Sequence, residues 1–368
     1  MTRTADVAIV GGGISGASLA ARLAGRAKTI ILEMEQAPGY HATGRSAAMF
    51  EPSFGPPAIR ALTLASGPFL REPPDGFCET PLVAPRGVLL CAEPGDEPLL
   101  EQARLRGYAD LTLADAKRMV PALRTEALIA ALYDEATLDV DVDALHRAFL
   151  RQHRRAGGES IFNARVLAAE RRGGAWALAT AAGDVSAPVV VNAAGAWADA
   201  LAALFGLPPL GLQPKRRSAA IVPPPPVENF PRWPQVFAAR EDFYCKPMGG
   251  KLMISPSDAE PMDPHDAFAD DLVLAEGIAA CERVLAIEVK RIERSWGGLR
   301  TFAPDGAPVA GFNPAAEGFF WLAGQGGYGI QIAPALSAVA ATLLLGDQSP
   351  DLPRGVKATA LGPARFRG

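Results

Sequence analysis

The chain begins with an apolar run, a cluster of glycines and an alanine-rich run, which together read DVAIVGGGISGASLAARLAG at residues 6–25. The apolar run is typical of a buried strand, and the alanine-rich run favours a helix. Gly11 permits a tight turn between them, Gly13 lets the backbone approach a ligand, and Gly16 lets the helix pack closely on the strand. We therefore expect a strand–turn–helix unit of a parallel α/β domain.

A second apolar run, KTIILE, ends in Glu33, about 20 residues beyond the glycines. The first helix presents free amide groups and its positive dipole end to phosphates. A carboxylate at Glu33 accepts both hydroxyls of an adenosine ribose and disfavours the 2′-phosphate of NADP. The alternative is a glycine-rich turn that binds no cofactor, but the turn, the helix after it and the acid at Glu33 all fit a dinucleotide site. The residues predicted to bind the dinucleotide here are Gly11, Gly13, Ile14, Ser15, Gly16 and Glu33.

Because FAD and NAD share this glycine pattern, other segments must decide between them. A long irregular segment, QAPGYHATGRSAAMF at 36–50, replaces the regular units that an NAD domain would continue with. Two further runs, at 189–201 and 318–336, each combine an apolar strand, a glycine-rich turn and a helix. Glycine turns spread over the whole chain favour one large cofactor contacted from several segments, which fits FAD better than NAD.

Length and composition exclude several classes of protein. A chain of 368 residues is long enough for about two domains. Its net charge of −4 provides no basic field for nucleic acid, so we expect no nucleic-acid partner. The four cysteines lack CxxC spacing, which argues against a zinc site or disulfide framework, and we expect no metal. The apolar run at 333–346 is too short to span a bilayer, so we expect no transmembrane segment.

Several segments carry a family resemblance: GYHATGRSAA, NAAGAW, LQPKRRSA, FYCKP, WGGLRTFAPDG and GFFWLAGQGGYGIQ. On these segments the chain resembles the D-amino-acid oxidase/glycine oxidase family of FAD-dependent oxidoreductases, and within it bacterial D-arginine dehydrogenase-type D-amino acid dehydrogenases. The resemblance covers nearly all of the chain. It implies an α/β fold with a Rossmann-like FAD-binding domain of the glutathione-reductase type. It also implies a second, α+β substrate domain built on a mixed β-sheet.

We expect the FAD-binding domain to be assembled from 1–80, 141–212 and 296–368, and the substrate domain from 81–140 and 213–295.

Within these domains the pattern predicts a strand at 85–93 and a helix, turn and helix at 99–123. Residues 139–158 predict a helix that ends at glycine. We expect 221–234 to be a proline-rich surface loop and the tail from 347 to be a loose terminus.

The resemblance implies noncovalent FAD, held along its length by small residues and backbone amides. His41 is the place where some related enzymes attach FAD covalently, which is the alternative. The other histidines, His146, His153 and His265, lie in polar stretches and are expected at the surface. The further FAD-binding residues implied are Thr43, Arg45, Ser46, Ala47, Ala48, Val166, Ala194, Gly195, Trp197, Gly324, Gly326, Gly327, Tyr328, Gly329, Ile330 and Gln331.

The resemblance also assigns a substrate clamp. Arg300 matches the arginine that grips the substrate α-carboxylate, a role suited to a planar and permanently charged guanidinium. Tyr244 matches the tyrosine that hydrogen-bonds the same carboxylate, and Gly327 offers its carbonyl to the amine. The alternatives are an ion-paired arginine and a core or edge-strand tyrosine. The cations at 215–217 are expected mainly at the surface or between domains, with Arg217 able to face the pocket.

The side-chain pocket is where the sequence departs from the D-arginine dehydrogenase-type enzymes. Their His, Tyr and Glu are replaced here by Met49, Phe54 and Gly87, and Arg217 and Gln331 complete the expected pocket. Without the acid, a cationic side chain would be buried without its counter-charge. We therefore expect neutral, apolar D-amino acids to be favoured over D-Arg or D-Lys.

The implied activity is oxidative deamination of a D-amino acid, by hydride transfer from the α-carbon to flavin N5, to give the 2-oxo acid and ammonia. No acid or histidine stands out as an obligatory base. Electrons would pass to a quinone or respiratory carrier or to O₂. We expect a monomer or homodimer in the cytoplasm, or peripheral at the inner membrane. The alternatives are oxidation of an N-methyl amino acid, glycine, sarcosine or a 2-hydroxy acid, or a non-catalytic FAD-binding assembly factor.

Overall fold

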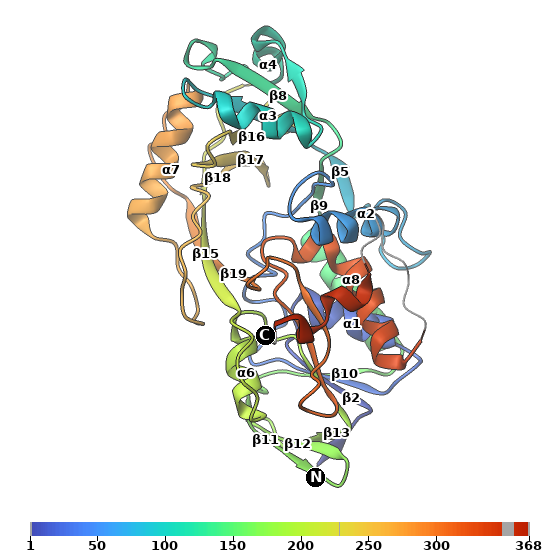
Figure 1. Ribbon diagram of the computed structural model, residues 1–368. Helices are drawn as coiled ribbons and strands as arrows, with labels where there is room; N and C mark the ends of the chain where they lie inside the picture. The colour runs from blue at the N-terminus through green and yellow to red at the C-terminus, as the bar shows by residue number, and fades with distance from the viewer. Residues whose placement is uncertain (1, 228, 348–356, 367–368) are drawn as a thin grey trace.

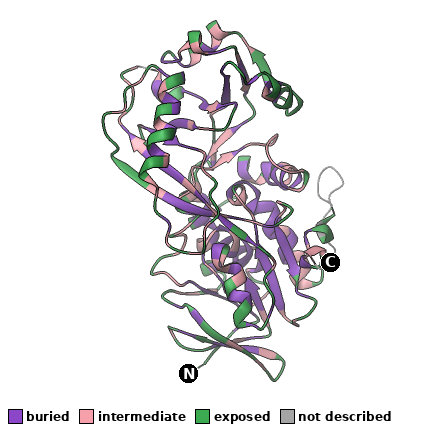
Figure 2. Ribbon diagram, turned by 60° about the vertical axis from the view of Figure 1, so that its left-hand side comes forward, coloured by how far each residue is buried: buried purple, intermediate pink, exposed green. Residues whose placement is uncertain are grey.

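The computed structural model describes residues 2–227, 229–347 and 357–366. It consists of two sheet-centred parts, one above the other in Figure 1. Buried residues concentrate in the sheets and in the helix faces turned toward them (Figure 2).

A six-stranded sheet forms the core of the lower part. All neighbouring strands pair in parallel except the last two, β21 and β20. The central strands are buried on both faces, which explains their unbroken apolar sequences. The strand order is β10 (Glu159–Ile161), β3 (Thr29–Leu32), β2 (Val7–Val10), β14 (Val189–Asn192), β21 (Phe319–Ala323) and β20 (Val309–Phe312).

Helices cover one face of this sheet and a small sheet covers the other. Val7 and Ile9 of β2 pack among residues of the helices, whereas Ala8 and Val10 pack toward the small sheet. The helices are α1 (Ile14–Leu23), α2 (Pro57–Arg71), α5 (Val142–Arg155) and α8 (Gly329–Leu345). The small sheet has the order β1 (Arg3–Thr4), β13 (Val185–Ala187), β12 (Ala175–Thr180) and β11 (Val166–Arg172), with α6 (Ala198–Leu204) beside it.

An eight-stranded mixed sheet forms the core of the upper part. Its pairs are antiparallel except β16 with β6. Helix α7 (Asp271–Val284) packs on this sheet, and α3 (Glu97–Leu105) and α4 (Leu113–Met119) lie near its far edge (Figure 1). The strand order is β19 (Arg294–Phe302), β15 (Gln213–Val222), β18 (Lys251–Ser255), β17 (Tyr244–Met248), β16 (Gln235–Ala238), β6 (Val88–Ala92), β8 (Ala130–Asp134) and β7 (Ala109–Leu111).

A three-stranded sheet connects the two parts. It consists of β4 (Met49–Phe50), β9 (Leu138–Val140) and β5 (Val83–Pro85). It therefore ties the segment after the first glycine turn to the chain entering and leaving the upper part.

The structure corrects several expectations about local structure. The expected boundary at 296 falls inside β19, which pairs along β15 and so belongs to the eight-stranded sheet. The turn expected within 99–123 contains strand β7. The 221–234 segment is not wholly a surface loop, because Phe230 and Trp233 are buried in the core of the upper part.

Two of the three histidines expected at the surface are buried. His146 contacts the carbonyl of Gly12 at 2.8 Å, and His153 contacts the hydroxyl of Thr29 at 2.8 Å. Both lie on the inner face of α5, whose helical spacing turns them toward the first sheet. His265 is exposed, as expected.

The tail is also better anchored than expected over its described part. Short 3₁₀ helices occupy Ala358–Leu361 and Pro363–Phe366. Leu361 is buried, and Arg365 pairs with Asp305 at 2.8 Å. Residues 348–356 and 367–368 lie outside the described residues.

Candidate functional site

A cavity of about 670 Å³ is lined by both parts of the molecule. That volume lies within the usual range for ligand pockets. Nearly all predicted site residues line it: Gly11, Gly13, Ile14, Ser15, Glu33, Thr43, Arg45, Ser46, Ala47, Ala48, Met49, Phe54, Val166, Ala194, Gly195, Trp197, Arg217, Tyr244, Arg300, Gly326, Gly327, Tyr328, Gly329, Ile330 and Gln331.

Three predicted residues lie outside the lining: Gly16, Gly87 and Gly324. Gly16 serves packing, since a Cβ there would lie 2.0 Å from the carbonyl oxygen of Gly11. Gly324 lies beside Ala303 in the turn before the last helix. Gly87 adopts φ +71°, and a Cβ there would collide with Tyr133, so its position is filled from behind by that ring.

The glycine turn after β2 fits a dinucleotide. Gly11 adopts φ +112°, and a Cβ on it would lie 2.3 Å from the carbonyl oxygen of Ala193. Gly13 is the N-cap of α1 and brings no side-chain cap, so the helix end is open toward the cavity. The site is thus a narrow backbone cradle that any larger residue would fill.

Glu33 is buried at the end of β3 and lines the same end of the cavity. Its Oε2 accepts the amide of Gly12 at 2.8 Å, and its Oε1 accepts the amide of Glu35 at 2.9 Å. These two bonds fix the carboxylate, and each oxygen keeps a further lone pair for a ribose hydroxyl. The donor set therefore fits the adenosine end of FAD.

The 43–48 segment runs along the cavity with mostly small residues. Thr43 accepts the amide of Ile14 at 3.0 Å and so joins this segment to the start of α1. The Arg45 guanidinium is engaged by protein groups: it donates to the carbonyls of Ala267 and Gly297 at 2.8 and 2.9 Å and pairs with Asp266. Arg45 thus fastens this segment to the upper part, and its side-chain donors do not point to a free cofactor-binding role.

His41 also lines the cavity. Its Nε2 contacts Glu35 at 2.9 Å, and its ring lies 4.6 Å from that of Trp197 between centroids. One ring nitrogen is therefore occupied by a carboxylate of the protein.

The β21–α8 turn brings the last glycine run to the cavity. Gly326 adopts φ +56°, and its amide donates to the carbonyl of Thr301 at 2.7 Å. A Cβ on Gly327 would lie 3.0 Å from Nη1 of Arg300, so the backbone here passes directly beside that guanidinium. Gln331, in the first turn of α8, accepts the amide of Glu51 at 2.8 Å.

The predicted clamp residues come from the same sheet: Arg300 is on β19, Arg217 is on the adjacent β15, and Tyr244 is on β17, beyond β18. In the β15–β19 register, Arg217 lies opposite Gly298 and Lys215 opposite Arg300. The guanidinium of Arg217 lies 5.6 Å from the ring centre of Tyr244. Arg217, Tyr244 and Arg300 thus face one region of the cavity from three strands.

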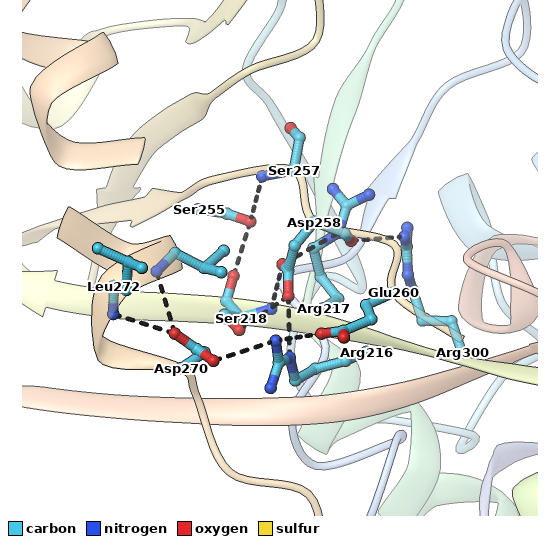
Figure 3. Close-up of polar contacts among 11 residues, drawn as sticks. Arg216, Arg217, Ser218, Ser255, Ser257, Asp258, Glu260, Asp270, Leu272 and Arg300 are labelled. Carbon is cyan, nitrogen blue, oxygen red and sulfur yellow. Dashed lines mark hydrogen bonds and ion pairs between the residues drawn. The ribbon is translucent and has the colours of Figure 1, made fainter. Parts of the chain in front are cut away.

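One backbone carbonyl positions both arginines. The Asp258 carbonyl accepts Nε of Arg217 at 2.8 Å and Nη2 of Arg300 at 3.4 Å (Figure 3). The Asp258 carboxylate in turn accepts the amide and hydroxyl of Ser218 at 2.6 and 2.9 Å. The turn containing Asp258 therefore fixes the geometry of the clamp from the side of β18.

Arg217 and Arg300 differ in how the protein balances their charge. Nε of Arg217 lies 4.0 Å from the Asp258 carboxylate, which also pairs with Arg216. Arg300 forms no ion pair with any described carboxylate, and its buried Nε lacks a hydrogen-bond partner among the described residues. Burial and the nearby Arg217 lower the pKa of Arg300 to about 10. Burial would raise the pKa of Tyr244, but Arg217, Ser255 and Arg300 outweigh it and hold that pKa below its ordinary value.

Arg216 corrects the expectation of a surface cluster at 215–217. It is buried and pairs with Glu260 at 2.6 Å, Asp258 at 3.4 Å and Asp270 at 3.5 Å. Strand alternation places it on the face of β15 opposite its neighbour Arg217.

Sequence reasoning missed an acidic residue in the cavity wall. Glu51 lies just after β4 and accepts the hydroxyl of Tyr108 at 2.9 Å. Burial raises the pKa of Glu51 to about 7; the bond from Tyr108 opposes that rise, and Asp134 adds to it. In the sequence, only its position between Met49 and Phe54 indicated that Glu51 lies in the pocket. Its partners Tyr108 and Asp134 come from distant segments.

The described part of the chain shows neither a metal-binding cluster nor a membrane-spanning helix. Those residues contain no group of three or more His, Cys, Asp or Glu arranged to hold a metal ion. Among the same residues no helix combines the length and apolarity needed to cross a membrane.

Comparison with known proteins agrees with this site. The family model described as FAD dependent oxidoreductase (DAO) matches residues 6–343. A glycine oxidase of Geobacillus kaustophilus is 28% identical over 366 residues, covering 94% of each chain. FAD-dependent oxidoreductase domain-containing protein 1 of Xenopus laevis is 25% identical, covering 93% of this chain and 79% of that protein.

Solved structures agree in fold. The crystal structure of glycine oxidase from Geobacillus kaustophilus aligns with a TM-score of 0.85 at 26% identity, covering 100% of both chains. L-proline dehydrogenase from P. horikoshii gives a TM-score of 0.85 at 21% identity, covering 100% of this chain and 98% of that one. The predicted fold, an FAD-binding domain joined to a second domain on a mixed sheet, is confirmed.

The narrower resemblance to D-arginine dehydrogenase-type enzymes stays a prediction, because these relatives are glycine oxidases and other members of the family. The matched model spans most of the chain and its glycine turns line the cavity. The chain therefore belongs to the DAO family of FAD-dependent oxidoreductases and is an FAD-dependent oxidoreductase.

Proposed function

We propose that this protein catalyses oxidative deamination of a D-amino acid to the 2-oxo acid and ammonia. The observation that carries the proposal is the clamp: Arg300, which forms no ion pair with any described carboxylate, lies with Arg217 and Tyr244 in the cavity that the glycine turns also line. Such a cluster of positive charge suits a substrate carboxylate. The D configuration rests on the family resemblance of the clamp segments.

The protein's own contribution is to orient the substrate. Arg300 and Tyr244 bind the α-carboxylate, and the backbone beside Arg300 at Gly327 offers its carbonyl to the amine. Fixing both groups on the α-carbon sets the direction of its remaining C–H bond. FAD held by the glycine turns and Glu33 would supply the acceptor for the hydride from this carbon. The resulting imino acid is hydrolysed by water to the 2-oxo acid and ammonia.

We propose that FAD is bound noncovalently. Glu33, the glycine turn and the 43–48 backbone supply its contacts, and Nε2 of His41 is already engaged by Glu35. Acid precipitation of the holoprotein should release the flavin into the supernatant. A flavin that stays with the precipitated polypeptide would contradict this proposal.

We propose that uncharged side chains are favoured over D-Arg and D-Lys. Gly87 brings no side chain to the cavity, and Tyr133 occupies the space behind it. Met49 and Phe54 line the cavity with uncharged side chains. A buried cation would therefore lack the acid that position 87 provides in the D-arginine dehydrogenase-type enzymes, and Glu51 in the cavity wall is mainly neutral below about pH 7.

The function is tested by anaerobic bleaching of the purified holoenzyme with a panel of substrates. The panel contains D- and L-amino acids, glycine, sarcosine and a 2-hydroxy acid. We expect D-amino acids with uncharged side chains to reduce the flavin fastest. Reduction only by sarcosine or the hydroxy acid, or by none of the compounds, would contradict the proposal. Repeating the assay in air with peroxide detection, and with a quinone, identifies the electron acceptor.

A further inference from the structure

The cavity has a second polar end, distinct from the arginine clamp. Glu51, Tyr108, Arg106 and Glu241 line the cavity and come from segments separated in the sequence. Their only direct bond to one another is that from the Tyr108 hydroxyl to Oε1 of Glu51. The other carboxylate oxygen of Glu51, Oε2, forms no hydrogen bond with any described residue. A polar atom is therefore available to a ligand.

Glu51 is held in place on both sides. Its amide donates to the Gln331 side chain at the start of α8, and its carboxylate is fixed by Tyr108. The phenol of Tyr108 is itself buried. The free oxygen is thus presented by a rigid group, and a rigid acceptor loses little entropy when it binds a donor.

Tyr328 and Phe54 connect the clamp with this second polar end. Tyr328 follows Gly327, where a Cβ would lie 3.0 Å from Nη1 of Arg300. The Phe54 ring lies 5.9 Å from that of Tyr328 between centroids, and the Arg106 guanidinium lies 5.6 Å from the Phe54 ring centre. An α-amine, one carbon from the clamped carboxylate, belongs near the clamp, and the far end belongs to the side chain.

We propose that Glu51, supported by Tyr108, forms a subsite that receives the hydrogen-bond donor of an uncharged polar substrate side chain. The inference rests on the proposed function and sharpens its substrate class: side chains ending in an amide or hydroxyl are preferred over apolar side chains of equal size. A site built to pair with a donor rejects the analogue that lacks it, because its own polar group is left unpaired.

The charge of the subsite depends on pH. Four groups influence the charge of Glu51: Arg106 and Tyr108 from the segment after α3, Asp134 from β8, and Glu241 from the loop after β16. Since burial raises the pKa of Glu51 to about 7, the neutral acid predominates below that pH and the carboxylate above it. A cationic side chain therefore gains affinity only as the pH rises through about 7.

The test compares substrates of nearly equal shape on the holoenzyme. D-Asn is paired with D-Leu and D-Gln with D-Met, and flavin reduction is followed anaerobically for the wild type and for Glu51→Met and Glu51→Gln. We expect the wild type to favour the polar member by about tenfold or more in the second-order rate constant. Glu51→Met should remove that preference. The ratio of D-Lys to D-Gln should rise with pH in the wild type and stay flat in Glu51→Gln.

Tyr108→Phe serves as a second variant that leaves Glu51 in place. Loss of the phenol bond removes a stabiliser of the carboxylate, so the rise of the D-Lys to D-Gln ratio should move to higher pH. Two results would overturn the inference: equal polar-to-apolar ratios in wild type and Glu51→Met, or an equal loss of rate for every substrate in Glu51→Gln. The second result would indicate that Glu51 accepts a proton from the substrate amine. Failure of every amino acid to bleach the wild-type flavin would instead contradict the proposed function.

Discussion

At the scale of single residues, Arg300 bears most of the proposed chemistry. It is largely buried, faces a cavity, and finds no acid among the described residues to neutralise it. An unpaired buried cation is costly unless a ligand supplies the counter-charge. A bound carboxylate would supply it, and the sequence segment WGGLRTFAPDG already predicted this role for Arg300.

Replacement of Arg300 by Met should lower the second-order rate constant for flavin reduction by ~10²–10³-fold, because two charge-assisted bonds to the carboxylate are lost. Arg294→Met is the matched control. Arg294 lies on the same strand but is exposed, and its guanidinium stacks over Trp296. Stopped-flow reduction of both variants checks the prediction. A loss of less than about threefold in Arg300→Met, or an equal loss in the control, would contradict it.

Ionisation of Tyr244 should weaken carboxylate binding by the clamp at high pH. Its pKa lies below the ordinary tyrosine value, so the phenolate forms beside the arginines before the pH reaches about 10. The phenolate repels a carboxylate, and binding should therefore weaken as the pH rises through this pKa. The inhibition constant of a 2-oxo acid, which has no amine to titrate, measures the effect. Tyr244→Phe should move the rise up to about pH 10, where Arg300 itself loses its charge, and an unchanged profile in that variant would refute the assignment.

At the scale of elements, the turn after β18 was invisible in the sequence. Its carbonyl at Asp258 holds Arg217 and Arg300, and its carboxylate binds Ser218 on β15. The strands themselves were largely predictable, because their apolar runs and glycine turns have local causes. The network under the clamp was not, because it joins segments about 40 residues apart in sequence through pairings that no local pattern encodes.

Asp258→Ala should both destabilise the fold and weaken substrate binding. It leaves the buried Arg216 with only its more exposed acids, at an expected cost of about 2–4 kcal/mol in the free energy of unfolding. The shifted carbonyl should also raise KM. Glu260→Gln is the control, since its side chain is 58% exposed although it pairs with the same arginine. Denaturant unfolding and KM are measured together, and equal effects in both variants would contradict the positioning role.

At the scale of the whole molecule, the cavity is lined by segments from the start, middle and end of the chain. The glycine turns predicted this arrangement because their spacing and small residues demand a close backbone approach. Sequence reasoning misplaced the boundary at 296, since β19 extends into the second sheet, and it missed Glu51, whose partners are assembled only by folding. The role of a residue could be predicted where the neighbouring sequence indicates it. It could not be predicted where it depends on partners that are distant in the sequence.

Removal of FAD should therefore lower the melting temperature of the whole protein. A ligand at 1,000 times its Kd stabilises the folded state by about 4 kcal/mol. Glu33→Gln should weaken FAD binding, because it loses the charge that accepts the ribose hydroxyls and the amides of Gly12 and Glu35. Thermal unfolding with and without added FAD checks both statements. A melting temperature that does not respond to FAD would show that the cofactor does not join these segments.

The rate of anaerobic flavin reduction by an uncharged D-amino acid, with hydrogen or deuterium on the α-carbon, tests the central claim most directly. Cleavage of the α-C–H bond predicts slower reduction by the deuterated substrate, no reduction by the L enantiomer, and a large loss of rate in Arg300→Met. Equal rates for both isotopes and both enantiomers, with Arg300→Met unaffected, would contradict the account.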